Sequence, residues 1–372
     1  MHRRGASWIA CCVVMVVVTA TYDLEIGTSV AAVKFAYSLH SPILIDGNRG
    51  FNATNGVVGG SGTLRSPYVI EGWEIDATAS PGIWVQNTTS AFVLRDVYVH
   101  SASYSNIGIL VLNASNGWVD RVKLVGTSYG LRVIESAHIN VSQSTFSNNT
   151  EGIFLDTATW SLVYANDFLR NWEGLHIFMS SNISLTGNVL SNNLGGIEVE
   201  TESTGIVIAD NSIRNSPVGV SVAYSNNATV IENNFTQDRV GLFLDSSTRV
   251  AVYHNNFMNK SNQAYDSGGQ FNTWDNGYPS GGNYWGNYSG VDRCSGPNQS
   301  TCNGPDGIGD TSYPVWVGDA DHYPLMHPYP SQGAIPSTPI GLALAAIAGA
   351  IVLAAVAGVL VLRRRKKGRP GP

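Results

Sequence analysis

Four side chains in the middle of the chain could together perform acid–base chemistry: Asp156, His176, Glu198 and Glu200. Glu198 and Glu200 alternate along one extended segment, so they point the same way and lie ~7 Å apart. That spacing is close to the carboxyl pair of enzymes that hydrolyse glycosides with inversion. The alternative is a solvated acidic patch, because Glu202 continues the alternation and three acids in a row suggest a charged face.

Aromatic and basic side chains share the outward direction of these acids. Ring faces stack on the apolar faces of sugars, and carboxylates accept hydrogen bonds from sugar hydroxyls. A ridged face that combines the two suits a glycan or a protein of the cell envelope. The residues that we predict to bind such a ligand are Trp84, Arg132, Phe154, Phe178 and Phe243.

A loop near the C-terminal end interleaves carboxylates with glycine. Asp306 and Asp310 lie within it, and Asp292 is nearby. Such a loop can wrap a hard cation, so Ca²⁺ is the one metal that this part of the sequence suggests. The alternative is a loop without a cofactor, because Asp-Gly also marks ordinary turns.

The strongest pattern in the sequence is a repeat of about 22 residues. Short apolar segments follow eight glycines that are spaced by 26, 22, 22, 22, 22, 23 and 22 residues. Residues one and three after each glycine are apolar and point into a core, whereas residues two and four point outward. One unit cannot bury its apolar face alone, so the repeat predicts stacked coils. The glycines are Gly82, Gly108, Gly130, Gly152, Gly174, Gly196, Gly219 and Gly241.

Two columns of amide side chains recur with the same period. Amides of this kind bond to neighbouring main chain at turns, and stacked coils bring successive ones within ~4.8 Å. We predict that they link each coil to the next rather than bind a ligand. One column is Asn166, Asn188, Asn211, Asn233 and Asn255, and the other is Asn149, Asn171, Asn193, Asn215, Gln237 and Asn259.

The predicted fold is all-β: a right-handed, single-stranded parallel β-helix, or pectate-lyase-like solenoid, with about 22 residues and three short strands per coil. The right hand follows the general rule for parallel crossovers. We expect the repeats over residues 82–275, after an N-terminal cap with irregular coils at 33–81. A Gly- and aromatic-rich C-terminal cap follows at 276–328, where Cys294 and Cys302 are close enough to form a disulfide.

The two ends of the chain predict export and anchoring. Residues 1–32 have the pattern of a signal peptide, with an uncleaved signal anchor as the alternative. After a linker at 329–339, the uncharged segment 340–362 is long enough to cross a bilayer as a helix. The basic tail 363–372 would stay in the cytoplasm. We therefore expect a single-pass protein of the cell membrane with most of its chain extracellular and with sequons open to glycosylation.

Composition narrows the class of partner. Eight basic residues lie at the two ends, which leaves 13 of the 21 basic residues against 27 acidic ones in between. An acidic middle argues against nucleic acid, whose phosphates require a basic surface. The abundance of glycine, with 40 residues, argues against a mostly helical enzyme.

Residues 41–327 resemble the archaeal NosD-like surface proteins. The resemblance is carried by the recurring Asn-Asn-x-x-Gly-Ile spacing, by the segment from Gly60 to Trp73 and by Gly282-Asn-Tyr-Trp-Gly-Asn-Tyr and His322-Tyr-Pro-Leu-Met. It implies the right-handed β-helix module of carbohydrate-binding proteins and sugar hydrolases. It also raises copper, but His322, Met326 and His327 are the one place where such ligands are close in the sequence.

These observations favour a surface-anchored, non-catalytic β-helix that binds glycans or envelope components through its outward side chains. The alternative is a polysaccharide hydrolase or lyase that acts through Asp156, Glu198 and Glu200, with His176 beside them. A structural spacer of the cell wall is the third interpretation.

Overall fold

The computed structural model describes residues 37–258, 262–316 and 318–330. These residues all belong to one unit. The predicted signal region, the membrane segment 340–362, the basic tail and most of the linker lie outside them. In the described part of the chain, no helix is both apolar and long enough to span a membrane.

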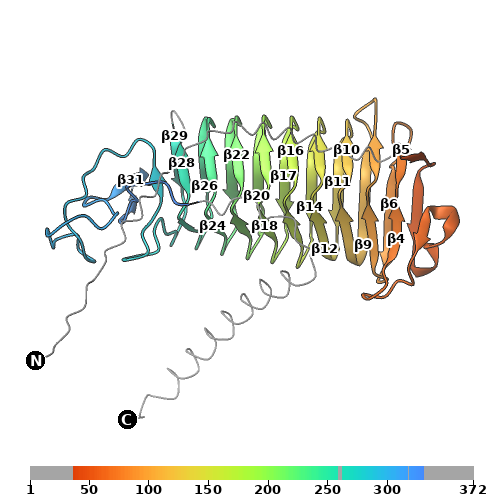
Figure 1. Ribbon diagram of the computed structural model, residues 1–372, viewed down its shortest axis with the longest axis horizontal. Coiled ribbons are helices and arrows are strands. Elements are labelled where there is room, and N and C mark those ends of the chain that lie inside the picture. The colour runs from red at the N-terminus through yellow and green to blue at the C-terminus, as the bar shows by residue number, and fades with distance from the viewer. Residues whose placement is uncertain (1–36, 259–261, 317, 331–372) are drawn as a thin grey trace, which may run out of the picture. The chain divides into compact units, whose positions relative to one another are not determined.

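The described residues form a right-handed parallel β-solenoid in which each full coil contributes a strand to each of three sheets (Figure 1). Sheet 1 contains β2 (Ile43–Asp46), β6 (Ile83–Thr88), β9 (Ile107–Asp120), β11 (Tyr129–Ile134), β14 (Glu151–Asp156), β17 (Glu173–Phe178), β20 (Gly195–Glu200), β23 (Val218–Ala223), β26 (Val240–Asp245) and β29 (Asn262–Ser267).

The other two sheets are built from shorter strands. β9 runs on into sheet 2, which also contains β3 (Val57–Gly59), β4 (Tyr68–Glu71), β7 (Phe92–Arg95), β12 (Ala137–Ser142), β15 (Leu162–Tyr164), β18 (Ser184–Thr186), β21 (Val207–Ala209), β24 (Thr229–Ile231) and β27 (Ala251–Tyr253). Sheet 3 contains β1 (Ser38–Leu39), β5 (Trp73–Asp76), β8 (Tyr98–His100), β10 (Lys123–Val125), β13 (Thr145–Ser147), β16 (Asp167–Leu169), β19 (Val189–Ser191), β22 (Ser212–Arg214), β25 (Asn234–Thr236), β28 (Asn256–Met258) and β30 (Tyr284–Trp285).

The glycine column exists because successive coils approach closely at that position. A Cβ atom on Gly152 would lie 2.4 Å from the carbonyl oxygen of Gly174, and one on Gly174 would lie 2.7 Å from that of Gly196. Strands of sheet 1 pair in parallel and in register, with Leu175 between Ile153 and Ile197. The predicted stacking of coils is confirmed.

The core is a set of inward columns, one residue from each strand in each coil. Phe146 stacks on Phe168 with ring centroids 5.0 Å apart, and Phe235 stacks on Phe257 at 4.8 Å. Side chains in this column are at most 1% exposed. Burying a large apolar side chain contributes roughly 2 kcal/mol, so the column supplies much of the free energy that holds the coils together.

The first predicted amide column is a continuous buried ladder at the corner between sheets 2 and 3. The backbone N–H of each member donates to the side-chain oxygen of the next, from Asn166 to Asn188 at 3.0 Å and from Asn188 to Asn211 at 2.9 Å. The ladder ends in the C-terminal cap, where Asn283 donates to the carboxylate of Asp321 at 2.7 Å. Burial raises the pKa of Asp321 to about 7, against the opposing effect of these hydrogen bonds.

The second predicted amide column is correct for its first three members and wrong after Asn193. One extra residue at the corner Thr201–Glu202 shifts every later position, so Ser216 and Asp238 take the ladder positions. Asn215 and Gln237 instead lie one residue earlier, with left-handed backbone, and Asn259 is outside the described residues. A third ladder, in which Ser180 donates to Ser203, was not predicted.

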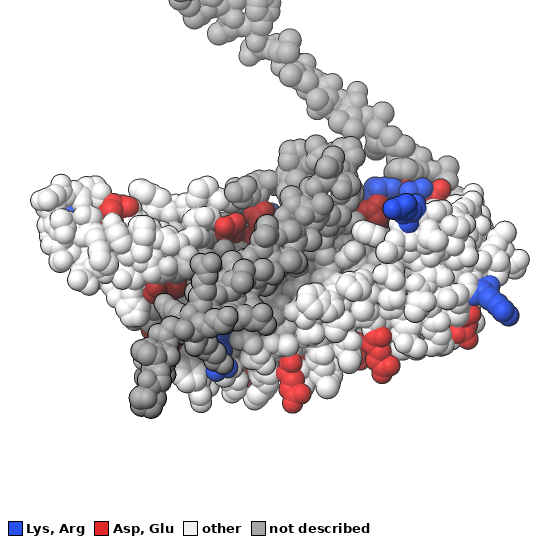
Figure 2. Space-filling view, turned by 90° about the horizontal axis from the view of Figure 1, so that it is seen from below, with Lys and Arg blue, Asp and Glu red and all other residues white. Residues whose placement is uncertain are grey.

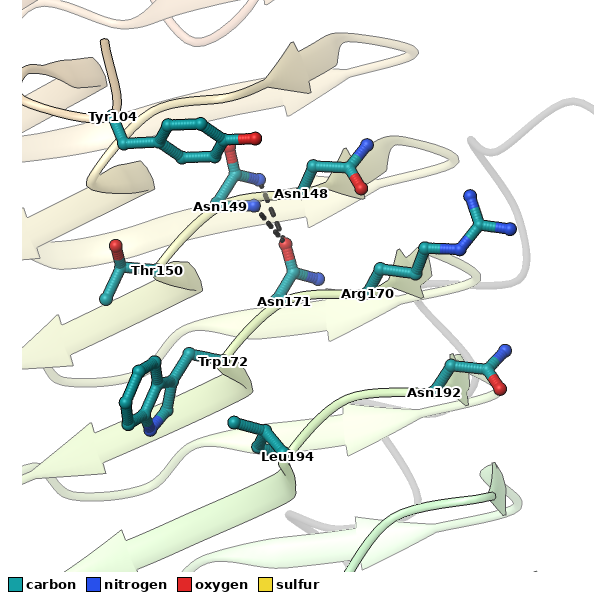
Figure 3. A pocket seen from close by; sticks show the side chains of 9 residues that line it. All are labelled: Tyr104, Asn148, Asn149, Thr150, Arg170, Asn171, Trp172, Asn192 and Leu194. Atoms are coloured by element: carbon teal, nitrogen blue, oxygen red, sulfur yellow. Dashed lines mark hydrogen bonds between the residues drawn. The ribbon is translucent and has the colours of Figure 1, made fainter.

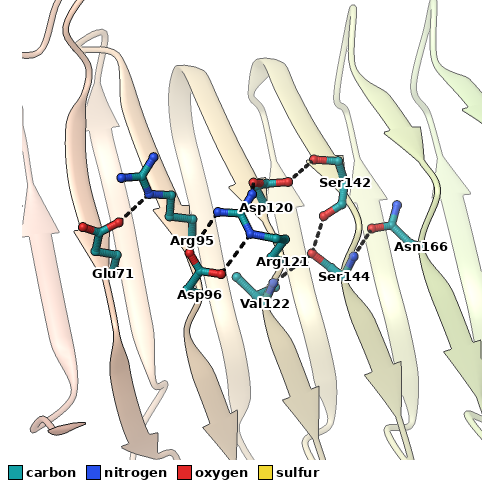
Figure 4. Close-up of polar contacts among 9 residues, drawn as sticks. All are labelled: Glu71, Arg95, Asp96, Asp120, Arg121, Val122, Ser142, Ser144 and Asn166. Atoms are coloured by element: carbon teal, nitrogen blue, oxygen red, sulfur yellow. Dashed lines mark hydrogen bonds and ion pairs between the residues drawn. The ribbon is translucent and has the colours of Figure 1, made fainter. Parts of the chain in front are cut away.

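In the first coils, ion pairs occupy the corner that asparagines take later (Figure 4). Arg95 pairs with Glu71 across coils, and Arg121 bridges Asp96 and Asp120. Ser142 then bonds to Asp120. The hydroxyl oxygen of Ser144 accepts a bond from the backbone N–H of Val122. The backbone N–H of Ser144 donates in turn to the side-chain oxygen of Asn166, where the amide ladder starts.

Irregular segments close both ends of the solenoid. The N-terminal end has the short 3₁₀ helices η1 (Asn48–Gly50) and η2 (Ala53–Asn55), and coil pairing already begins at β1 and β2, inside the predicted cap. The C-terminal cap holds the hairpin β31 (Tyr313–Trp316) and β32 (Asp319–Asp321). Trp285 stacks between Phe257 and Tyr313, and the predicted Cys294–Cys302 disulfide is present.

Candidate functional site

The outward side chains of sheet 1 form one continuous strip, here called the sheet 1 strip. In it, the ring of Phe154 pairs in register with His176, and His176 with Glu198. Asp156, Phe178 and Glu200 follow in the neighbouring row. The alternation in the sequence therefore placed all four predicted acid–base residues on one face.

His176 lies at the centre of a charged group that we call the His176 cluster: His176, Glu151, Glu173, Glu198 and Glu200. Its Nδ1 atom is 3.3 Å from Oε2 of Glu151 and 3.4 Å from Oε2 of Glu173. Its Nε2 atom is 3.1 Å from Oε1 of Glu200 on the next coil. Both ring nitrogens of His176 therefore contact carboxylates. Only 14% of the His176 side chain is exposed, so water screens these contacts only in part.

The cluster shifts two pKa values in the same direction. Burial acts to lower the pKa of His176, but the carboxylates of Glu151, Glu173 and Glu200 outweigh it and raise this pKa to about 9. Burial, together with repulsion from the Glu198 carboxylate, raises the pKa of Glu173 to about 7. Near neutral pH, the cluster therefore contains a cationic imidazole and a carboxyl group that exchanges its proton readily.

An aromatic and guanidinium group adjoins the cluster on the preceding coils. The guanidinium carbon of Arg132 lies 4.9 Å from the ring centroid of Tyr129 and 5.3 Å from that of Phe154. Its Nη2 atom is 3.9 Å from Oδ2 of Asp156. Phe154 is only 9% exposed, because Tyr129 and His176 cover it, so Phe178 offers the more accessible ring.

Not every predicted residue meets the cluster. Trp84 lies on the strip two coils before Arg132, and Phe243 lies two coils after Glu198. Glu202 is not on the strip at all, because β20 ends at Glu200 and Glu202 belongs to the exposed corner with left-handed backbone. Of the three alternating acids that suggested a charged face, only Glu198 and Glu200 therefore lie on the strip.

Sequence reasoning missed Glu151 and Glu173, which complete the cluster, and Tyr129, which stacks near Arg132. All three occupy the residue just before the repeat glycine, and that position also points outward. Strict alternation would point this residue inward, because it has the parity of the apolar positions, but the strand departs from alternation at the glycine. The sequence pattern therefore gave no signal for these three residues.

The predicted calcium ligands lie in the C-terminal cap, where each carboxylate bonds to backbone amides. Asp292 accepts from Asp306 and Gly307, and Asp310 accepts from Arg293 and Cys294. Within the described residues, the one group of carboxylates and histidines that could share a metal ion is Glu151, Glu173 and His176. The calcium site stays a prediction.

Comparisons with known proteins agree on the architecture. Residues 89–290, just over half of the chain, match the NosD family, described as periplasmic copper-binding protein. No match was found among curated proteins. Tailspike protein 2 of Escherichia coli O157:H7 bacteriophage CAB120 is 12% identical, with a TM-score of 0.50 over 66% of this chain and 39% of that chain.

Two further solved structures are similar over part of the chain. The periplasmic alginate epimerase AlgG is 17% identical, with a TM-score of 0.43 over 61% of this chain and 72% of that one. DFA-IIIase of Arthrobacter chlorophenolicus A6, without its lid, is 17% identical, with a TM-score of 0.45 over 56% and 64%. The chain spans well under half of the tailspike protein, and at 12% identity that likeness shows the solenoid fold alone.

Proposed function

The chain belongs to the NosD family, and from this premise we propose that it binds an extended, uncharged polysaccharide along the sheet 1 strip. The observation that carries the proposal is that aromatic rings and hydrogen-bonding carboxylates lie in contact on one face. The Tyr129–Arg132–Phe154 group lies directly against the His176 cluster, with ring centroids of Phe154 and His176 4.6 Å apart. Rings stack on the apolar faces of sugars, and the adjacent carboxylates accept bonds from hydroxyls.

The charge of the strip selects against anionic polymers. Three glutamates pair with a single imidazole, a fourth, Glu198, lies in register beside it, and Arg132 is already paired with Asp156. A chain of uronic acids would add negative charge at this point, and like charges held close in a partly desolvated site repel each other. On the face seen in Figure 2, acidic side chains lie in separate groups along the coils.

Substitution of Phe178 by alanine tests the binding proposal. Phe178 is a partly exposed ring of the strip, and loss of an aromatic anchor is expected to weaken binding about tenfold. Dissociation constants for neutral and uronic oligosaccharides would be measured by calorimetry with the full chain. Phe271→Ala is the matched control, because Phe271 is 75% exposed but lies outside sheet 1. Equal losses in the two variants, or tighter binding of the uronic series, would refute the proposal.

Catalysis at the same strip is a second candidate, favoured by the raised pKa of Glu173. A carboxyl group with a pKa of about 7 can donate its proton to a glycosidic oxygen at neutral pH. The carbon–oxygen bond then breaks, water adds to the anomeric carbon, and a second carboxylate such as that of Glu200 takes the proton of the water.

Glu173→Gln separates this candidate from simple binding. A glutamine cannot supply the proton, so release of reducing ends from neutral polysaccharides is expected to fall at least a hundredfold while affinity is retained. The Glu135→Gln variant is the control, because Glu135 is exposed and lies at a corner after β11. If the wild-type chain binds glycans without releasing any product, the catalytic candidate is rejected and binding stands.

The description of the family names copper, but no suitable donor set for copper is found among the grouped histidine, cysteine and carboxylate side chains of the described residues. The one candidate group offers a single imidazole, both of whose nitrogens face carboxylates, and it has no sulfur. Cu(I) selects soft sulfur ligands, and Cu(II) requires a planar set of nitrogen and oxygen donors. We therefore derive no step through copper.

We also propose that the solenoid is displayed outside the cell and held at the membrane by residues 340–362. Support comes from the uncharged length of that segment and from the basic residues that follow it. The Cys294–Cys302 disulfide is in keeping with an oxidising, extracytoplasmic location.

A further inference from the structure

An open recess lies at the corner between sheets 3 and 1, around the edge from the His176 cluster. It is formed where β13, β16 and β19 end and the next strands of sheet 1 begin. The buried ladder residues Asn149 and Asn171 form its floor, and exposed columns flank them on both sides (Figure 3).

The column on the sheet 1 side of the ladder is apolar at its centre. Trp172 and Leu194 follow ladder residues on successive coils and are 63% and 52% exposed. Tyr104, which is 56% exposed, stands at one end of the recess. An exposed indole beside an exposed leucine is costly in water, and a flat apolar ligand face would relieve that cost.

The column on the other side of the ladder is polar. It contains Asn148, Arg170 and Asn192, one on each of three successive coils, and all three have left-handed backbone. Figure 3 shows Arg170 between the two amides, pointing away from the floor. Within the described residues, Arg170 forms no ion pair, so its guanidinium donors are available to a ligand.

We propose that this recess is a second glycan subsite, which holds one neutral sugar residue with its apolar face on Trp172. Its hydroxyls accept bonds from Arg170 and from the amides of Asn148 and Asn192. Trp172 directly precedes Glu173 in the chain, so a branch of a polysaccharide on the sheet 1 strip can reach around the corner. The ligand class rests on the proposed function, but the residues that carry the subsite are separate from the strip.

Trp172→Ala tests the subsite, and Trp160→Ala is a close control. Trp160 is likewise a corner tryptophan and is 60% exposed, but it lies between sheets 1 and 2. The probes are cello-, manno- and galacturono-oligosaccharides, with full-length protein from a host that does not glycosylate the sequon at Asn148. Trp172→Ala is expected to weaken binding of a neutral probe about tenfold, Arg170→Gln about threefold, and Trp160→Ala not at all.

Comparison with Phe178→Ala separates the two proposals. If Phe178→Ala weakens binding and Trp172→Ala does not, the subsite is wrong and the strip stands. If only Trp172→Ala weakens it, the strip is wrong and the recess is the binding site. The subsite is also wrong if no neutral probe binds. It is equally wrong if the protein prefers the uronic probe and Trp172→Ala does not change that preference.

Discussion

Replacement of Asn188 by alanine is expected to lower the free energy of unfolding by roughly 3 kcal/mol. The Asn188 side chain is fully buried and bonds to both neighbouring coils, since its amide donates to Oδ1 of Asn211 on the next coil at 3.0 Å and its other bonds reach the preceding coil. Its oxygen accepts from the backbone and side chain of Asn166 at 3.0 and 3.1 Å, and its amide donates to Val163 at 2.9 Å. Alanine removes the acceptor of the buried Asn166 backbone N–H and opens a cavity, and both effects are destabilising.

Thermal unfolding followed by calorimetry and circular dichroism would measure this effect. Asn298→Ala is the control, because Asn298 is exposed in a turn of the C-terminal cap and should change stability by less than about 0.5 kcal/mol. A solenoid can unfold from one region, so the loss should be largest in the transition of the central coils. A stability change at Asn188 no larger than that at Asn298 would show that the ladder does not hold the coils together.

The fold was predictable because each coil repeats the same local rules. Gly152, Gly174 and Gly196 recur where a Cβ would strike the carbonyl of the next coil, and Asn166 to Asn255 recur where one amide bonds the next. What the period could not show was the position of the single inserted residue. It lies at Thr201–Glu202, and it moved Asn215 and Gln237 out of their ladder.

The sequence could predict which side chains of the candidate site face outward, but not which of them contact one another. Alternation fixed which side chains leave the core, so Asp156, His176, Glu198 and Glu200 were found on one face. It does not fix the rotamers of long side chains, so the pairing of Arg132 with Asp156 and of Glu151 with His176 followed only from coordinates. The recess at Trp172 was also missed, because it lies at a corner where neither strand alternation nor the amide columns describe the exposed residues.

Replacement of His176 by glutamine is expected to destabilise the chain by about 2 kcal/mol at pH 7.5, less than for a fully buried pair because water screens part of the interaction. Glutamine keeps most of the volume of the ring but removes the cation that holds Glu151, Glu173 and Glu200 together. The remaining carboxylates, with Glu198, then repel one another in a half-buried site. His138→Gln is the control, because His138 is exposed.

The pH dependence makes this prediction specific. The pKa of His176 is raised from 6.5 to about 9, so its stabilising contribution is fully present below pH 6.5 and is lost as the pH rises through 9. The pKa of Glu173 is raised from 4.5 to about 7, so its contribution is present below pH 4.5 and is lost as the pH rises through 7. Wild-type stability from this site should therefore fall between pH 5 and 9.

The difference between His176→Gln and wild type should follow the charge of the cluster rather than the loss of a packed ring. Denaturant unfolding at several pH values is expected to show the largest difference near pH 6, where the glutamates are ionised and His176 is fully protonated. The difference should decline as the pH rises through 9, and it should be small near pH 4, where glutamates take up protons. Adding Glu151→Gln to the variant should restore part of the loss at pH 7.5, because it removes one of the repelling carboxylates. A difference that is the same at pH 4 and pH 7.5, and that Glu151→Gln does not reduce, would mean that His176 acts through packing against Phe154 instead.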